Sequence, residues 1–264
     1  RTTKRITSTP QQERSVWFGK DGRTLYYAAE RNGHWGIWET SLTDKDDKCF
    51  TYAVNLKERM MTKAGDTCFQ PQVSPDGEKI AYLKDRTAIA VMDLKNGKEK
   101  IILDRNINYS YTDGDQSFAW SPDSRYILCN YQKNGGWNNE DVAIIDVETG
   151  VATNLTESGY SDGGFRWAMK GKAMTWTSDK AGYRSHGSWG AERDIYIMFF
   201  DGKEYAEFRS DKEDKDIAKL MKDEKEKKQE KKKEAKDSAK VEKKTEELNL
   251  DLENRKYRTM KLTR

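Results

Sequence analysis

A tight polar turn followed by alternating apolar and polar residues recurs along this chain and limits its fold more than any other feature. The clearest copy is Ser74-Pro75-Asp76-Gly77, followed by the run Glu78–Tyr82. Proline presets the backbone φ for a turn, aspartate can bond its own backbone, and glycine accepts a positive φ at no steric cost. Two strands should therefore reverse direction at this point.

The turn returns at a nearly constant interval. Related turns lie at residues 18–22, 120–124 and, in a degenerate form, 167–171. Their marker positions Asp21, Asp76, Asp123 and Lys170 are 55, 47 and 47 residues apart. A period of about 40 to 50 residues made of short strands is typical of propeller blades.

Each repeat holds further strand-like runs rich in aromatic and aliphatic residues. Second strands are expected at Thr24–Glu30, Lys79–Asp85, Tyr126–Gln132 and Ala173–Asp179, and third strands at Gly36–Leu42, Ala88–Leu94, Asp141–Val147 and Asp194–Phe200. The sequence thus predicts an all-β chain, a β-propeller of four-stranded antiparallel blades. We place the blades at about 15–62, 70–103, 118–156 and 165–263.

An aliphatic residue followed by threonine marks the end of a repeat. It occurs as Ile6-Thr7, Met61-Thr62, Leu155-Thr156 and Leu262-Thr263, which we interpret as outermost strands. Residues 1–7 would then be a leading outer strand whose blade is missing. We therefore expect residues 1–264 to be part of a larger ring, since closed propellers have about four to eight blades. A ring of four blades stays possible, and the start at Arg1 rather than Met favours a piece of a longer chain.

The last blade is interrupted by a charged segment. Residues 210–247 consist mostly of Lys and Glu with Ala, and the few apolar residues Ile217, Leu220 and Met221 stand near the start. Glu and Lys four apart on a good helix former predict an exposed helical insertion. A solvated insertion is the simple interpretation, and a docking arm is the alternative.

Composition excludes several classes of function. The net charge of +3, from 48 basic and 45 acidic residues, gives no reason to expect a nucleic-acid partner. No apolar run reaches the roughly 18 residues of a membrane span. Cys49, Cys68 and Cys129 match neither a zinc site nor a disulfide framework, so we expect them to be buried or half-buried and we predict no metal or cofactor.

Meander topology predicts which connections share a rim. The turns between second and third strands and the crossings between blades should lie at one end, where aromatic, acidic and glycine residues gather. We predict a peptide- or partner-binding rim of Trp35, Tyr109, Tyr111, Asp113, Asp115, Trp137, Tyr160, Asp162, His186 and Trp189. The acids could receive a peptide N-terminus or basic side chains. For any single residue, simple turn formation remains the alternative.

No catalytic residue is predicted. The segment Gly159-Tyr160-Ser161-Asp162-Gly163 matches a nucleophile elbow, but that motif requires a helix after the serine, and here a strand is expected. Ser185 next to His186 is no better, since neighbours in an extended segment point apart. Asp113 and Asp115 alone are weak signs of a cation site.

At these repeats the chain resembles the tricorn-like proteases of the S41 serine peptidase class. The shared pattern is the WD40-like Pro-Asp (PD40) repeat, seen at Ser74-Pro75-Asp76-Gly77 and Ser121-Pro122-Asp123-Ser124. More specific segments are residues 29–35, 135–139, 154–163 and 179–190, together with the insertion before residues 251–255, and these resemble the Bacteroidetes branch.

The resemblance implies a propeller that gates or docks peptides for a peptidase core elsewhere in the chain. It further implies a PDZ module, additional propeller, a hydrolase as the parent and a periplasmic or otherwise exported location. The alternative is a stand-alone propeller, like that of the Tol-Pal system, that binds a protein and hydrolyses nothing. A rim made catalytic by Ser161 or His186 is the third hypothesis.

Overall fold

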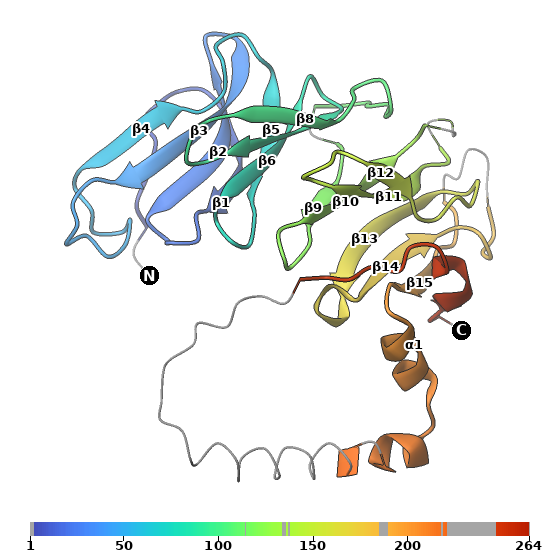
Figure 1. Cartoon of the computed structure of the whole chain (residues 1–264). Coiled ribbons are helices and arrows are strands. Elements are labelled where there is room, and N and C mark those ends of the chain that lie inside the picture. Colours follow the sequence, from blue (N-terminus) through green and yellow to red (C-terminus); the bar gives the residue numbers. More distant parts are fainter. Residues whose placement is uncertain are drawn as a thin grey trace, which may run out of the picture.

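The structure, a computed structural model, describes residues 3–113, 115–133, 136, 138–184, 190–217, 219–220 and 247–263. It consists of four antiparallel sheets of four strands each, and every sheet takes its strands in consecutive order (Figure 1). This confirms the predicted all-β propeller fold with four-stranded blades. The expected second and third strands agree with the observed ones to within two residues.

The strands of the first two blades are β1 (Glu13–Phe18), β2 (Thr24–Arg31), β3 (His34–Leu42) and β4 (Leu56–Met60), then β5 (Cys68–Val73), β6 (Lys79–Lys84), β7 (Ala88–Asp93) and β8 (Glu99–Leu103). Those of the third and fourth are β9 (Phe118–Trp120), β10 (Tyr126–Tyr131), β11 (Asp141–Asp146) and β12 (Ala152–Asn154), then β13 (Asp162–Ala168), β14 (Ala173–Ser178), β15 (Asp194–Phe199) and β16 (Thr259–Lys261). Helix α1 (Gly202–Arg209) follows β15.

The Pro-Asp turns are held by their own side chains. The Ser74 hydroxyl donates to Asp76 Oδ1 at 2.5 Å and accepts the Lys79 amide at 3.0 Å. Ser121 repeats this arrangement with Asp123 at 2.5 Å and the Tyr126 amide at 2.8 Å. These turns therefore shape the chain, as the sequence indicated.

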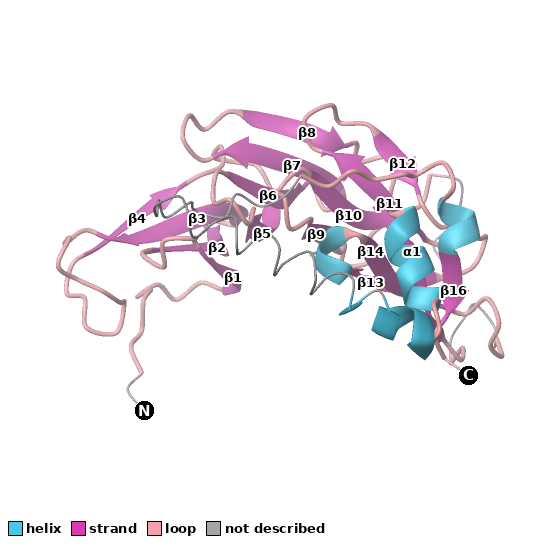
Figure 2. Ribbon diagram, turned by 60° about the horizontal axis from the view of Figure 1, so that its bottom comes forward, coloured by secondary structure: helices cyan, strands magenta, loops and turns pink. Residues whose placement is uncertain are grey.

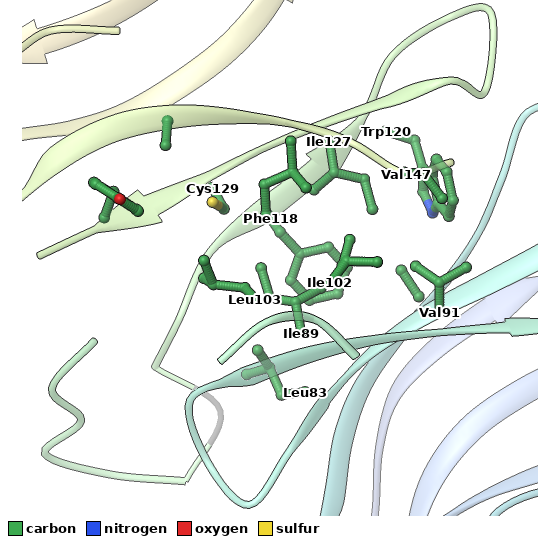
Figure 3. Packing of buried hydrophobic residues seen from close by; sticks show 14 of the residues in the cluster. Leu83, Ile89, Val91, Ile102, Leu103, Phe118, Trp120, Ile127, Cys129 and Val147 are labelled. Carbon is green, nitrogen blue, oxygen red and sulfur yellow. The ribbon is translucent and has the colours of Figure 1, made fainter. Parts of the chain in front are cut away.

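The sheets follow one another in an arc, with sheet one and sheet four at its two ends (Figure 2). A separate apolar cluster joins each neighbouring pair, and Figure 3 shows the one between blades two and three, where Leu83 and Ile89 face Phe118 and Ile127. Polar bonds across the seams add to this packing. The indole Nε1 of Trp120 donates to the Gln72 carbonyl at 3.0 Å, and that of Trp167 donates to the Ala119 carbonyl at 3.1 Å.

Both end faces of the arc are covered by segments outside the blades. On blade one, Leu25 and Tyr27 pack with Phe50 and Ala53 of the β3–β4 loop, and Ile6 lies against them. On blade four, Tyr205 and Phe208 of α1 pack on Phe199 with tilted rings, and the ring centroids are 5.6 and 5.1 Å apart. These segments shield part of the apolar surface of blades one and four.

Several details differ from the prediction. Residues 3–12 form no strand: Gln12 accepts the amide of Glu30 in β2 at 3.0 Å, and Ile6 packs against the end cluster of blade one. The fourth blade's outer strand, β16, has only three residues, because a 3-10 helix occupies Arg255–Arg258 directly before it. Cys68 and Cys129 are buried as expected, but Cys49 is exposed, and all three are free.

The insertion also begins earlier than residue 210. Asp201 caps α1 by accepting the amides of Lys203 and Glu204, so the chain leaves the sheet directly after Phe200. It returns as a strap over the third and fourth blades, which we define as residues 247–258. Leu250 and Leu252 of the strap pack against the cluster between these blades, and Arg255 donates to the carbonyls of Asn154 and Leu155.

None of the described helices is long and apolar enough to cross a membrane.

Candidate functional site

Three crossings between blades lie on the predicted rim, and two of them carry predicted site residues. Crossing 104–117 joins β8 to β9, and crossing 155–161 joins β12 to β13. Since every sheet is a consecutive antiparallel meander, these crossings share one end of the blades with the β10–β11 and β14–β15 connections. The Pro-Asp turns lie at the other end.

Crossing 104–117 is held by Asp115. Its Oδ2 accepts the amides of Tyr111 at 2.6 Å and Thr112 at 3.1 Å. Partial burial acts to raise the pKa of Asp115, but hydrogen bonds from Thr112, Gln116, Ser110 and Tyr111 outweigh it and lower the pKa. The carboxylate of Asp115 is therefore used inside its own loop.

Two tyrosines project from this ordered crossing. The rings of Tyr109 and Tyr111 meet edge to face at 5.0 Å and are 54% and 62% exposed. The Tyr109 amide donates to Gln132 Oε1 at 2.5 Å, and its carbonyl accepts from Gln116 Nε2 at 2.9 Å. The pair thus presents aromatic surface on a fixed backbone, as a recognition surface requires.

Acidic residues from different loops converge beside this crossing. Glu140 accepts a 2.7 Å bond from Asn130 Nδ2, and burial, together with the charges of Asp115 and Asp162, raises its pKa. The Arg193 guanidinium acts in the opposite direction. Asp113 instead forms a 3.1 Å ion pair with Arg86 of the β6–β7 turn.

Crossing 155–161 is fixed by Asp141 at the start of β11. Asp141 Oδ1 accepts from the Thr156 hydroxyl and from the Ser158 amide, both at 3.0 Å. Ser158 then donates from its own hydroxyl to Asp162 Oδ2 at 2.6 Å. Burial raises the pKa of Asp162, which is 1% exposed, and the nearby charge of Asp141 adds to the shift.

The crossing forms one wall of a pocket of about 260 Å³ on the face of blade four that looks toward blade three. Trp176 and Tyr196 are stacked there with ring centroids 5.5 Å apart. The described lining residues are Leu155, Thr156, Glu157, Ser158, Asp162, Trp176, Ser178, Lys180, Tyr196, Met198, Lys256 and Thr259.

Ser161 has no nucleophile geometry. It is buried, its amide donates to Asp179 Oδ1 at 3.0 Å, and its hydroxyl accepts from Arg193 at 3.0 Å. Strand β13 follows it directly, so the strand-to-helix turn that exposes a catalytic serine is absent from this segment.

The remaining predicted rim residues have different surroundings. Trp35 belongs to β3 and packs on Phe69 with centroids 5.4 Å apart, so it serves the seam between blades rather than an open rim. The Arg184 guanidinium lies over the half-buried ring of Tyr160, 5.1 Å from the ring centroid. Trp137, His186 and Trp189 lie outside the described residues.

No local sequence pattern predicts the pocket itself. The sequence places Trp176 and Tyr196 in predicted strands and suggests no role for Ser158. The available signal was the alternation in β14 and β15, which puts Trp176 and Tyr196 on the same face of the sheet, opposite each other in register.

Comparison with solved structures now adds to this geometry. The chain is similar to the crystal structure of the tricorn protease, with 14% identity and a TM-score of 0.58 over 96% of this chain and 21% of that one. This is the β-propeller fold. TolB from Acinetobacter baumannii is 23% identical, with a TM-score of 0.41, and the match covers 71% of this chain and 38% of that chain. Oligogalacturonate lyase from Vibrio parahaemolyticus is 17% identical, with a TM-score of 0.43, and the match covers 73% of this chain and 65% of that chain.

The chain therefore spans less than two thirds of each of these proteins. At such identities the similarity to the tricorn protease shows the fold alone. No protein-family model and no curated protein matches the chain.

Proposed function

We propose that this propeller segment is a docking module that captures peptides or unfolded polypeptide on the crossing rim. The observation that carries the proposal is the exposed Tyr109–Tyr111 pair on a crossing whose backbone is fixed by Asp115, Gln116 and Gln132. Aromatic side chains on a rigid scaffold give large contact area at a low cost in conformational entropy. Asp113 on the same rim is half-exposed and, although it pairs with Arg86, suits the amines of a polypeptide.

Within a tricorn-like serine protease, such a rim would gate or guide peptides toward a catalytic core outside these residues. The Pro-Asp repeats and the fold shared with the tricorn protease support this reading. The parent would then be an exported, periplasmic hydrolase with PDZ and peptidase domains. The alternative is a stand-alone Tol-Pal-like interaction module, which the same rim would also serve.

Additional blades would complete the ring at the ends of the arc. Val16 and Phe18 of β1 are each 59% exposed, which leaves apolar surface beside the covered end face of blade one. We propose that another blade of the same parent packs there. This surface is the place where the remaining propeller would join.

A peptide-binding assay tests the proposal. The 264-residue chain is titrated with fluorescent, unstructured peptides of about twenty residues, and binding is followed by anisotropy. We expect Tyr109→Ala and Tyr111→Ala, alone or together, to weaken binding several-fold without lowering the melting temperature. Trp137→Ala and Trp189→Ala should act in the same direction.

Matched controls lie on the opposite rim. Tyr52 in the β3–β4 loop is 76% exposed, so Tyr52→Ala removes a comparable aromatic ring. Lys45→Ala and Lys98→Ala remove charges there. Equal losses from both rims, or no binding by the unaltered chain, would show that the crossing rim is not the docking surface.

A further inference from the structure

The pocket between blades three and four combines aromatic walls with a buried acid. Trp176 and Tyr196 stack as one wall, and the apolar side chains of Leu155 and Met198 also line the space. Its volume of about 260 Å³ is slightly below the usual range for drug-sized ligands and suits the end of one amino-acid residue.

Two buried polar atoms of the lining have no hydrogen-bond partner among the described residues. They are Oδ1 of Asp162 and Nε1 of Trp176, whose side chains belong to residues only 1% and 5% exposed. A buried polar atom without a partner costs about 1–3 kcal/mol. One atom can only accept and the other can only donate, so a ligand that satisfies both must carry a donor and an acceptor.

The charges around the pocket are unequally compensated. Glu157, which lines the pocket, forms ion pairs with Lys256 at 2.6 Å and with Arg255 at 3.3 Å. Lys180 also lines the pocket, and it is exposed to solvent. Asp162 forms no ion pair within the described part of the chain, and Asp141, whose charge adds to the rise in its pKa, is also acidic. A buried carboxylate without a cation is unfavourable unless a ligand supplies one.

We propose that this pocket binds a primary ammonium group of a polypeptide, with Asp162 as its counter-ion and the stacked Trp176 and Tyr196 as its aromatic wall. Aromatic faces attract such cations, and hydrogen bonding to the ammonium would satisfy Asp162 Oδ1. This inference rests on the proposed docking function and specifies which chemical group of the polypeptide the propeller would bind.

The group can come from a chain N-terminus or from a lysine side chain. Trp176 Nε1 favours the N-terminus, because the α-ammonium of a peptide is followed by a carbonyl that can accept from the indole. A lysine ammonium has no such acceptor beside it. Leu155 and Met198 would then contact the first side chain.

Isothermal titration calorimetry on the 264-residue chain distinguishes these sources. Leucinamide offers an α-ammonium beside a carbonyl, N-acetyl-lysinamide offers only a side-chain ammonium, and N-acetyl-leucinamide is uncharged. We expect leucinamide to bind most tightly, N-acetyl-lysinamide more weakly and the neutral compound not measurably. Tighter binding of N-acetyl-lysinamide would assign the pocket to lysine side chains and still support an ammonium site.

Two variants test the residues. Asp162→Asn should weaken leucinamide binding at least tenfold, and Trp176→Phe should weaken leucinamide but leave N-acetyl-lysinamide unchanged. Glu148→Gln, which removes one exposed negative charge from the β11–β12 turn, is the matched control. A melting curve establishes that each variant is folded.

Binding of N-acetyl-leucinamide as tight as that of the cations, no cation binding, or full binding by folded Asp162→Asn would overturn the ammonium site. The twenty-residue peptides separate this outcome from failure of the docking function. If binding of these peptides still depends on Tyr109 and Tyr111 while Asp162→Asn has no effect on binding, only the ammonium site is wrong. If they do not bind but leucinamide does, the pocket stands without the docking function.

Discussion

The hydroxyl of Thr62 accepts the backbone amide of Ile37 at 3.1 Å, while the amide of Met61 donates to the Ile37 carbonyl at 2.7 Å. The third blade repeats the arrangement with Thr156 and Val142 at 3.0 Å, and the fourth with Thr263 and Ile195 at 3.1 Å. The threonine hydroxyl therefore takes the place of a backbone carbonyl of the fourth strand as the last hydrogen-bond partner of the third strand. This explains why an aliphatic residue followed by threonine closes these repeats.

Thr62→Val should destabilise the chain by about 1–3 kcal/mol, because it leaves the buried Ile37 amide without an acceptor. Thr62→Ser keeps the hydroxyl and should cost clearly less. Urea unfolding of both variants measures the difference. Equal stability of the valine and unaltered proteins would mean that the pairing is not stabilising.

Trp120→Phe should cost about 1 kcal/mol by removing the hydrogen bond from Nε1 to the Gln72 carbonyl across the seam. Trp120→Ala should cost about 3–5 kcal/mol, since it also empties part of the cluster between blades two and three. Chemical denaturation separates the two contributions. A phenylalanine variant as unstable as the alanine variant would contradict the assigned role of the indole nitrogen.

Replacing residues 211–246 with a short Gly/Ser linker should cost less than about 1 kcal/mol, because this Lys/Glu-rich sequence offers the blades little apolar surface. Helix α1 and the strap must be kept, as they cover Phe199 and the seam between blades three and four. Tyr205→Ala, which uncovers Phe199, should lower the melting temperature more than the deletion does. A deletion as costly as Trp120→Ala would refute this view of the insertion.

Asp162→Asn should stabilise the fold at pH 7. Burial raises the folded-state pKa of Asp162, so the folded protein binds its proton more tightly than the unfolded chain. This difference in proton binding does not lower the free energy of unfolding below the ordinary aspartate pKa of about 3.9. The loss of stability grows as the pH rises from there to the folded-state pKa, and it persists above that value. The gain from Asp162→Asn should therefore disappear in acid.

Asp115→Asn is the control of opposite sign for this pH dependence. Hydrogen bonds lower the folded-state pKa of Asp115 against the effect of burial, so its charged form stabilises the protein above the ordinary pKa. That contribution is lost as the pH falls through the folded-state value. Unfolding curves at pH 7 and in acid should show Asp115→Asn less stable at pH 7 only; a loss of stability at pH 7 from Asp162→Asn would contradict the assignment for Asp162.

The chain by itself should not cleave peptides, because Ser161 is buried, bonded to Arg193 and followed by a strand. Incubation with a mixed peptide pool, followed by mass spectrometry, provides the measurement. Turnover that disappears in Ser161→Ala or His186→Ala would show that the rim is catalytic after all.

The sequence alone determined the blades. Turn chemistry at Ser74–Gly77 and Ser121–Ser124 and the alternation after each turn act over a few residues, so the strands and their consecutive order could be predicted. The same local patterns also placed crossing 104–117, with Tyr109 and Tyr111, on the rim opposite these turns.

Only the tertiary structure decided the pocket, the helix on Phe199 and the strap. The pocket exists because crossing 155–161 and β14 and β15 pack together with the strap residue Lys256, which lies far along the chain. Likewise Trp35, which resembled a rim residue in the sequence, belongs to a seam because Phe69 of the next blade lies against it. Such contacts depend on how whole blades stack, and no local pattern of residues encodes them.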